Sequence, residues 1–161
     1  MRALKLTIAA VLLAFAPVAA SADGAHSQTK ATAMVGEIHV SDGWVRAHLP
    51  NRPTAGYLSL KNTGDAADRL ISASSPAFKT IEIHKSRMED GVMKMEPVTG
   101  VSIDAGATAV LEPGGYHLMM FGGSGLKDGD TVEVTMVFET AGSVTLTMPV
   151  SKRGPKNAHN H

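Results

Sequence analysis

Residues 131–148 read TVEVTMVFETAGSVTLTM and contain the clearest structural pattern in the chain. Apolar side chains alternate with polar ones in both halves, and Ala141-Gly142 separates the halves. Such alternation is typical of strands buried on one face, and a short glycine turn joins two of them as an antiparallel hairpin. The pattern therefore predicts a hairpin whose core side chains are Val132, Val134, Met136, Phe138, Val144, Leu146 and Met148.

Similar short apolar runs fill the rest of the chain. Turn-forming stretches such as Asn62-Thr63-Gly64-Asp65 and Pro113-Gly114-Gly115 separate them, and no segment shows a convincing helical period. Many short strands at this spacing predict a single all-β domain, either a β-sandwich or a Greek-key barrel. The predicted strands are Glu37–Val40, Trp44–Leu49, Ala55–Leu60, Arg69–Ala73, Lys79–Lys85, Val92–Pro97, Ala107–Leu111 and His117–Gly122.

The two ends of the chain differ in composition from its centre. Residues 1–22 combine a basic start, an apolar run and a small-residue ending, which is the layout of a cleaved signal peptide. The alternative, an uncleaved anchor, needs a longer apolar run than this one. We expect an exported chain with a flexible leader at 23–36, the domain at 37–150 and a flexible tail at 151–161, and no membrane span once the signal is removed.

Composition excludes several classes of function. The chain has nine Met and no Cys, so it has no disulfide scaffold, thiolate zinc site, thiol nucleophile or blue-copper centre. Fifteen basic residues balance fifteen acidic ones, which makes nucleic acid and acidic membranes poor candidates as partners. No Ser-His-Asp arrangement or carboxylate pair stands out, and we expect a protein that is not an enzyme and is a monomer.

One group of imidazole and thioether side chains lies around Asp90-Gly91, a typical two-residue hairpin turn. A two-residue loop there predicts that Met88 pairs with Met93 and that Ser86 pairs with Met95. His84 then lies diagonal to Met95 on the same face, about 7–8 Å away at the backbone. A three-residue loop would put His84 and Met95 on opposite faces and abolish the site.

A second group lies at His117 and Met119, which are two residues apart and share one face of a strand. With His84 and Met95 they offer two nitrogens and two neutral sulfurs, a soft donor set that suits Cu(I) better than zinc, calcium or magnesium. The competing interpretation is that these Met fill a core and the His are structural, in a metal-free β-sandwich interaction module. We assign Met120, like Met136 and Met148, to the core, and Met88 and Met93 to an exposed patch that guides or hands over copper.

The spacing of these four residues is H-x10-M-x21-H-x-M, and it resembles the signature of the periplasmic copper chaperones of the PCuAC type. The resemblance covers Val40 to Val150. It includes Trp44-Val45-Arg46, Thr54-Ala55-Gly56-Tyr57, Asn62-Thr63-Gly64, Glu82-Ile83-His84 and Pro113-Gly114-Gly115-Tyr116-His117-Leu118-Met119.

This resemblance implies a cupredoxin-like β-barrel in the periplasm that binds one Cu(I) through His84, Met95, His117 and Met119. It also implies delivery of copper to the dinuclear copper centre of cytochrome c oxidase, directly or with a Sco-type thioredoxin-fold protein. Copper buffering or tolerance without a dedicated acceptor is the alternative within the same chemistry.

Five other histidines lie outside this signature. His159 and His161 in the tail could bind Cu(II) weakly, and His26 could do so near a new N-terminus; in each case a solvated side chain without a specific role is the alternative. His39 and His48 match no ligand position, so we expect them to be structural or exposed.

Overall fold

The computed structural model describes residues 31–154, which form eleven β-strands and no helix. No segment of this described part could therefore cross a membrane as a helix. The strands are β1 (Ala31–Val35), β2 (Ile38–Arg46), β3 (Thr54–Asn62), β4 (Asp68–Ser74), β5 (Thr80–Glu89), β6 (Val92–Pro97), β7 (Val101–Ile103), β8 (Thr108–Leu111), β9 (Tyr116–Phe121), β10 (Thr131–Phe138) and β11 (Gly142–Ser151).

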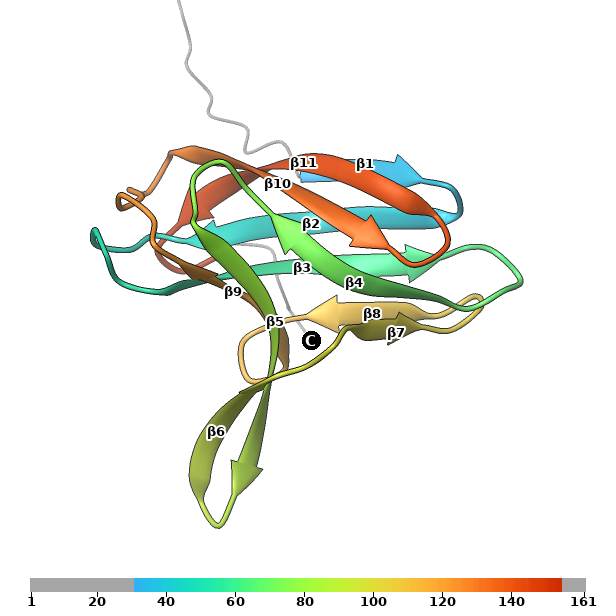
Figure 1. Cartoon of the computed structure of the whole chain (residues 1–161), viewed down its shortest axis with the longest axis horizontal. Helices are drawn as coiled ribbons and strands as arrows, with labels where there is room; N and C mark the ends of the chain where they lie inside the picture. Colours follow the sequence, from blue (N-terminus) through green and yellow to red (C-terminus); the bar gives the residue numbers. More distant parts are fainter. Residues whose placement is uncertain (1–30, 155–161) are drawn as a thin grey trace, which may run out of the picture.

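The strands follow one continuous hydrogen-bonded path that folds over on itself into two layers (Figure 1). The order along the path is β6-β5-β9-β8-β3-β2-β11-β10-β4-β7, with β1 paired to β2. Most neighbours are antiparallel, but β11 runs parallel to β2 and β8 parallel to β9, so the sheet is mixed. The apolar faces of the two layers enclose a single core, which confirms the predicted all-β domain.

The β10–β11 hairpin has the predicted register. Val132 pairs with Met148, and Val134 pairs with Leu146. All the predicted inward side chains but one are buried, because the period of the strand places them on the face toward the opposite layer; Val144 is partly buried against the same cluster. The core assignment of three methionines is also confirmed, since Met120, Met136 and Met148 have no exposed surface.

The boundaries of the domain differ from those predicted. Part of the expected leader forms β1, because Ala31, Ala33 and Val35 pack against the core while the strand pairs with β2. The two runs expected at 37–49 join into β2 through an irregularity between Ser41 and Trp44. The short strand β7 was not predicted, and β11 extends into the expected tail as far as Ser151.

The β5–β6 hairpin projects from the body of the molecule (Figure 1). The inner half of β5, residues 80–85, pairs with β9, whereas its outer half, residues 84–89, pairs with β6. Asp90 and Gly91 both have positive φ, 51° and 76°, as the predicted two-residue turn requires. The strand β5 thus links the body to an arm that extends beyond it.

Candidate metal centre

The candidate ligands lie where the projecting hairpin meets the body. His84 pairs with His117 across β5 and β9, and their ring centroids are 5.8 Å apart. On the other side of β5, Ser86 pairs with Met95, which is the predicted register. Because side chains two residues apart share a face, Met119 lies on the same face as His117. The pairings thus place all four candidate ligands on one face of three adjacent strands.

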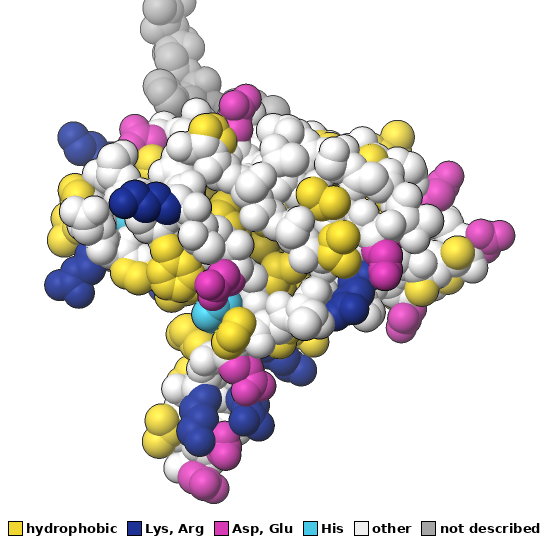
Figure 2. Space-filling view, in the orientation of Figure 1, with side chains coloured by type: hydrophobic (Ala, Val, Ile, Leu, Met, Phe, Trp, Pro, Cys, Tyr) yellow, Lys and Arg dark blue, Asp and Glu magenta, His cyan; other side chains and the backbone are white. Residues whose placement is uncertain are grey.

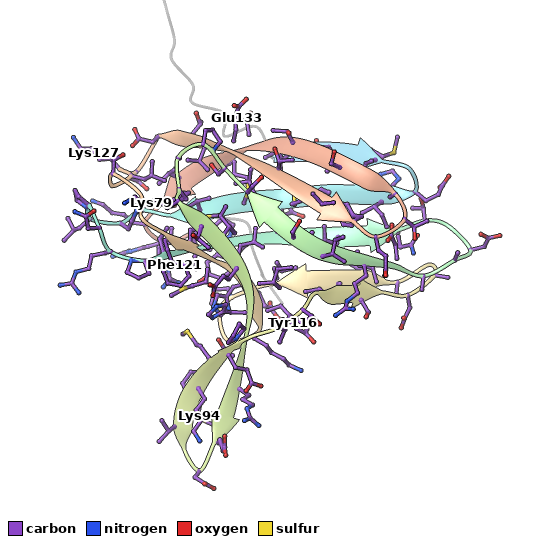
Figure 3. All side chains as sticks on the ribbon, viewed as in Figure 1. Lys79, Lys94, Tyr116, Phe121, Lys127 and Glu133 are labelled. Carbon is purple, nitrogen blue, oxygen red and sulfur yellow. The ribbon has the colours of Figure 1, made fainter. Side chains whose placement is uncertain are left out.

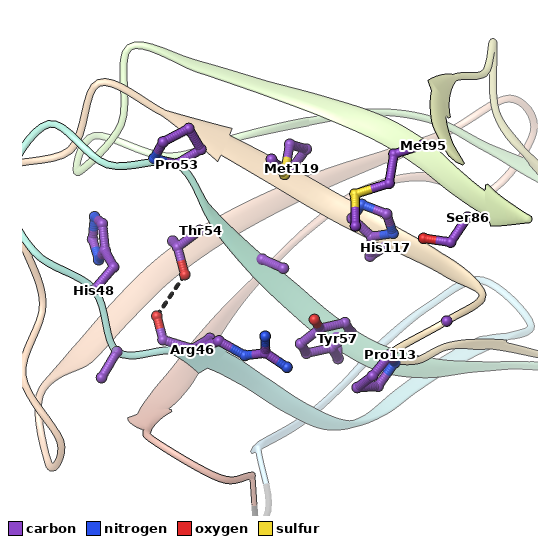
Figure 4. A pocket seen from close by; sticks show the side chains of 13 residues that line it. Arg46, His48, Pro53, Thr54, Tyr57, Ser86, Met95, Pro113, His117 and Met119 are labelled. Carbon is purple, nitrogen blue, oxygen red and sulfur yellow. Dashed lines mark hydrogen bonds between the residues drawn. The ribbon is translucent and has the colours of Figure 1, made fainter. Parts of the chain in front are cut away.

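A cavity of about 280 Å³ opens on this face. Met95, His117 and Met119 line it, and in Figure 4 the sulfur of Met95 points toward the ring of His117. His84 is not part of the cavity wall; its ring lies beside His117 and 6.3 Å from the ring of Phe121, centroid to centroid. The structure therefore brings three of the four predicted ligands to one cavity and places the fourth next to it.

His117 is held in the orientation that a metal ligand needs. Its Nδ1 lies 3.2 Å from the carbonyl oxygen of Gly115, so Nδ1–H donates to that oxygen and Nε2 carries the free lone pair. Burial lowers the pKa of His117; the hydrogen bond to Gly115 opposes this shift, and nearby His84 adds to it. A low pKa keeps the imidazole neutral, which is the form that binds metal.

His84 has a carboxylate partner two residues earlier on its strand. Glu82 Oε2 lies 2.7 Å from His84 Nε2, while His84 Nδ1 is buried and has no hydrogen-bond partner. An unpaired buried nitrogen is costly unless something binds it. With Nε2–H donating to Glu82, Nδ1 is the free donor atom, an arrangement in which a carboxylate fixes the tautomer of a metal-binding histidine. The residue pattern could have indicated Glu82, because it shares the strand face of His84.

The other side of the cavity is formed by residues that the ligand pattern did not indicate. The Tyr57 ring packs against Trp44 with 4.7 Å between the ring centroids and a tilt of 37°, and the guanidinium of Arg46 lies 5.7 Å from the centroid of the Tyr57 ring. The Thr54 hydroxyl donates to the carbonyl oxygen of Arg46 at 2.7 Å (Figure 4). Tyr57 and Arg46 thus form a packed aromatic and cationic wall opposite the thioethers.

Gly56 explains how β3 and β9 can approach so closely behind this wall. It pairs with Leu118, and a Cβ atom at this position would lie 2.6 Å from Cε of the buried Met120. A larger residue would force the buried Met120 side chain to shift on β9, the strand that also carries His117 and Met119. Glycine in this strand therefore leaves room for the buried Met120 side chain behind the candidate site.

The remaining predicted residues lie elsewhere. Met88 and Met93 pair with each other near the tip of the hairpin, away from the cavity. His39 is exposed on β2, whereas His48 lines the far end of the cavity with its ring 5.6 Å from that of Phe78. The three histidines at 26, 159 and 161 lie outside the described residues.

The donor set at this centre consists of two imidazoles and two thioethers. Within residues 31–154, no group of three or more His, Asp or Glu is arranged to hold a metal. The Glu82 carboxylate on this face contacts His84 and is not one of the four donors. Neutral nitrogen and sulfur donors suit a soft monovalent ion such as Cu(I). The residues present therefore fit a Cu(I) cargo better than a hard divalent cation.

Comparison with known proteins gives the family. The family model described as "LpqE-like: Putative lipoprotein LpqE-like" matches residues 38–150. This chain belongs to the LpqE-like family. The "Putative lipoprotein Lxx21020" of Leifsonia xyli subsp. xyli (strain CTCB07) is 32% identical to this LpqE-like chain over 146 residues, which cover 89% of this chain and 86% of the relative.

Solved structures share the fold of this LpqE-like chain. A structure titled "Copper-bound PCuAC domain from PmoF2" matches with a TM-score of 0.64 at 27% identity, over 77% of this chain and 98% of that domain. A solution structure of CuI-DR1885 from Deinococcus radiodurans matches with a TM-score of 0.53 at 27% identity, over 82% and 86% of the two chains. The cupredoxin-like β fold expected from the resemblance to PCuAC proteins is thereby confirmed.

Proposed function

We propose that this LpqE-like protein is a copper chaperone that carries Cu(I) on His84, Met95, His117 and Met119. One observation carries the proposal: the β6–β5 and β5–β9 pairings set two imidazoles with free nitrogens and two thioethers on one face of these three strands. Its similarity to domains whose titles describe them as copper-bound or CuI-loaded supports the choice of metal. The nitrogen and sulfur atoms of these four residues are the donors that such a carrier needs.

A competition titration tests this step. The apo protein is titrated with Cu(I) against a chromogenic Cu(I) chelator under anaerobic conditions, and the loaded protein is studied by X-ray absorption. We expect tight binding of a first equivalent with both nitrogen and sulfur neighbours around the metal. An oxygen-only shell, or no competition with the chelator, contradicts the proposal.

Delivery is the second part of the proposal. We propose that the acceptor is the dinuclear copper centre of cytochrome c oxidase, reached directly or with a Sco-type thioredoxin-fold protein. Mixing the Cu(I)-loaded protein with the purified oxidase copper domain should load that domain faster than an equal amount of chelated copper does. Equal or slower loading indicates a buffering protein, which holds copper without a dedicated acceptor.

We also propose that the protein works outside the cytoplasm, in the periplasm. Support comes from the signal-like residues 1–22 and from the relatives named as lipoproteins. The version that we propose is export with the signal-like segment removed. Cell fractionation with an antibody to the protein checks this: it should appear in the periplasmic fraction and be shorter than the full chain.

A further inference from the structure

The projecting β5–β6 hairpin has two chemically different faces. Arg87 on one face contacts Glu89 at 3.2 Å and Glu96 at 3.4 Å, and Lys94 contacts Glu89 at 3.0 Å. Figure 3 shows Tyr116 at the base of the hairpin, and the Lys85 ammonium lies 5.0 Å from the centroid of its ring. Figure 2 shows charged side chains covering the hairpin in this view. These charged side chains keep one face of the hairpin polar, as suits an element that projects into solvent.

The opposite face of the hairpin carries methionines. Met88 and Met93 are directly paired, and Met95 follows two residues after Met93 on the same face. The exposed fractions are 64% for Met88, 48% for Met93 and 57% for Met95. Flexible apolar chains of this kind usually fill cores, so three of them on an exposed arm require another explanation.

The backbone register brings the two outer thioethers close together. The Ser86 N–H donates to the carbonyl oxygen of Gly115 on the body at 3.0 Å, so it does not bond to β6, and the Ser86–Met95 pair is of the non-hydrogen-bonded kind. Because the two kinds alternate along an antiparallel ladder, the pair of Met88 and Met93 is non-hydrogen-bonded too. Side chains of such pairs are the closer ones, with Cα atoms about 4.5 Å apart.

This methionine face continues into the candidate metal centre. Met95 lines the same cavity as His117 and Met119, whereas Met93, two residues earlier on the same face, does not line it. The side chains of Met88 and Met93 are close together, and Met95 is two residues from Met93 on the same face. Thioethers are soft ligands of the kind that select Cu(I). A Cu(I) ion could therefore be held first by sulfurs of the arm and then by Met95 and the imidazoles.

We propose that Met88, Met93 and Met95 form a second Cu(I) site, made of thioethers only, through which copper moves between solvent or an acceptor and the inner centre. The step is a ligand exchange: one sulfur–copper bond breaks as another bond forms, and copper stays Cu(I) throughout. The proposal rests on the proposed function, since Met95 is shared by both sites. The arm then serves to hold the exchanging ion clear of the body.

The test compares three proteins: wild type, the double variant Met88→Leu/Met93→Leu and the control Met34→Leu. Leucine keeps the apolar surface and removes the sulfur, and Met34 is a methionine of β1 that is 62% exposed, far along the strand path from the arm. Each is titrated anaerobically with Cu(I) while the ε-methyl resonances of the methionines are followed by NMR. Release to a Cu(I) chelator is followed by stopped flow.

In wild type and the control, we expect the first equivalent of Cu(I) to shift Met95 and Met119. The second should shift Met88 and Met93 and shift Met95 again, because its sulfur is shared by the two sites. The double variant should bind only one equivalent, with unchanged affinity for it. Its release rate should fall about tenfold, as when a step that lowers the barrier by about 1.4 kcal/mol is lost. Unchanged Met88 and Met93 signals, or a double variant that matches wild type in both stoichiometry and release rate, would overturn the inference.

Two further outcomes separate this inference from other interpretations. If the first equivalent leaves the Met119 signal unshifted and X-ray absorption finds no nitrogen next to the bound copper, the proposed function fails. The shifts of Met88 and Met93 still report whether copper binds to the arm. A second double variant, Met88→Ser/Met93→Ser, identifies an apolar contact surface. If it slows transfer to a protein acceptor and the leucine variant does not, the arm binds by apolar contact and the thioether site is refuted.

Discussion

Methionine occupies two opposite environments in this protein. Between the two layers of the body, Met120, Met136 and Met148 are fully buried in the core cluster. On the β5–β6 arm, Met88 and Met93 expose about half of their surface or more. The side chain is the same in both places, so the surroundings decide its use: buried thioethers fill space between strands, and exposed ones keep their sulfur accessible to a metal.

The largest effect should come from a buried methionine. Replacing Met136 with alanine leaves a cavity between the layers, and we expect the free energy of unfolding to fall by about 2–5 kcal/mol. Urea denaturation measures this change. The matched substitution Met88→Ala on the arm should change the same quantity by no more than about 0.5 kcal/mol, because that side chain is mostly exposed. Equal losses for the two variants would show that the arm is part of the cooperative core.

The next largest effect should be a loss of Cu(I) affinity with little change in stability. Met119→Leu nearly conserves volume, so the free energy of unfolding should change by less than about 1.5 kcal/mol. Loss of a sulfur ligand should weaken Cu(I) binding more than loss of an outer-shell partner does, that is, by more than about 100-fold. Chelator competition measures the affinity, and Met148→Leu in the core is the control. Unchanged affinity in the Met119 variant removes this residue from the site.

A smaller loss of affinity should follow from changing Glu82. In Glu82→Gln the amide no longer fixes His84 as firmly as the carboxylate that lies 2.7 Å from Nε2, and Cu(I) binding should weaken by about 10-fold. The same competition assay applies, with Glu96→Gln on the charged face of the arm as a matched control. A variant that binds as tightly as wild type would mean that the strand pairing alone orients His84.

Much of the fold could be predicted because its signals are local. Alternating side chains and a glycine turn predicted the β10–β11 hairpin, and Asp90-Gly91 predicted the register that puts Met88 opposite Met93. In both cases a few adjacent residues determine the outcome through strand period and turn geometry. The three-residue strand β7 has too few residues to show a period, and it was missed.

The candidate site was less predictable because it depends on pairings between distant segments. Nothing local to His84 or to His117 says that β5 lies beside β9; that pairing depends on the burial of Ile83 and Leu118 on the opposite face. The wall formed by Arg46 and Tyr57 arises in the same way, from β2 and β3. Residue types and spacing predicted the donor atoms, and packing of the core brings them to one face.

The smallest expected effect concerns His48, the histidine at the far end of the cavity from the arm. Both of its ring nitrogens are buried without a hydrogen-bond partner, and this burial lowers its pKa from the usual 6.5. The unfolded chain therefore takes up a proton at higher pH than the folded protein, so the contribution of neutral His48 to stability is complete above pH 6.5 and is lost as the pH falls below it. Urea unfolding at pH 7.5 and 5.5 should show a smaller acid-induced loss for His48→Gln than for wild type, whereas His39→Gln, at an exposed position, should behave like wild type. A loss of the same size in all three proteins would show that His48 does not contribute to the acid sensitivity. His117, which lies where the arm meets the body and whose pKa burial also lowers, would then be the next histidine to replace.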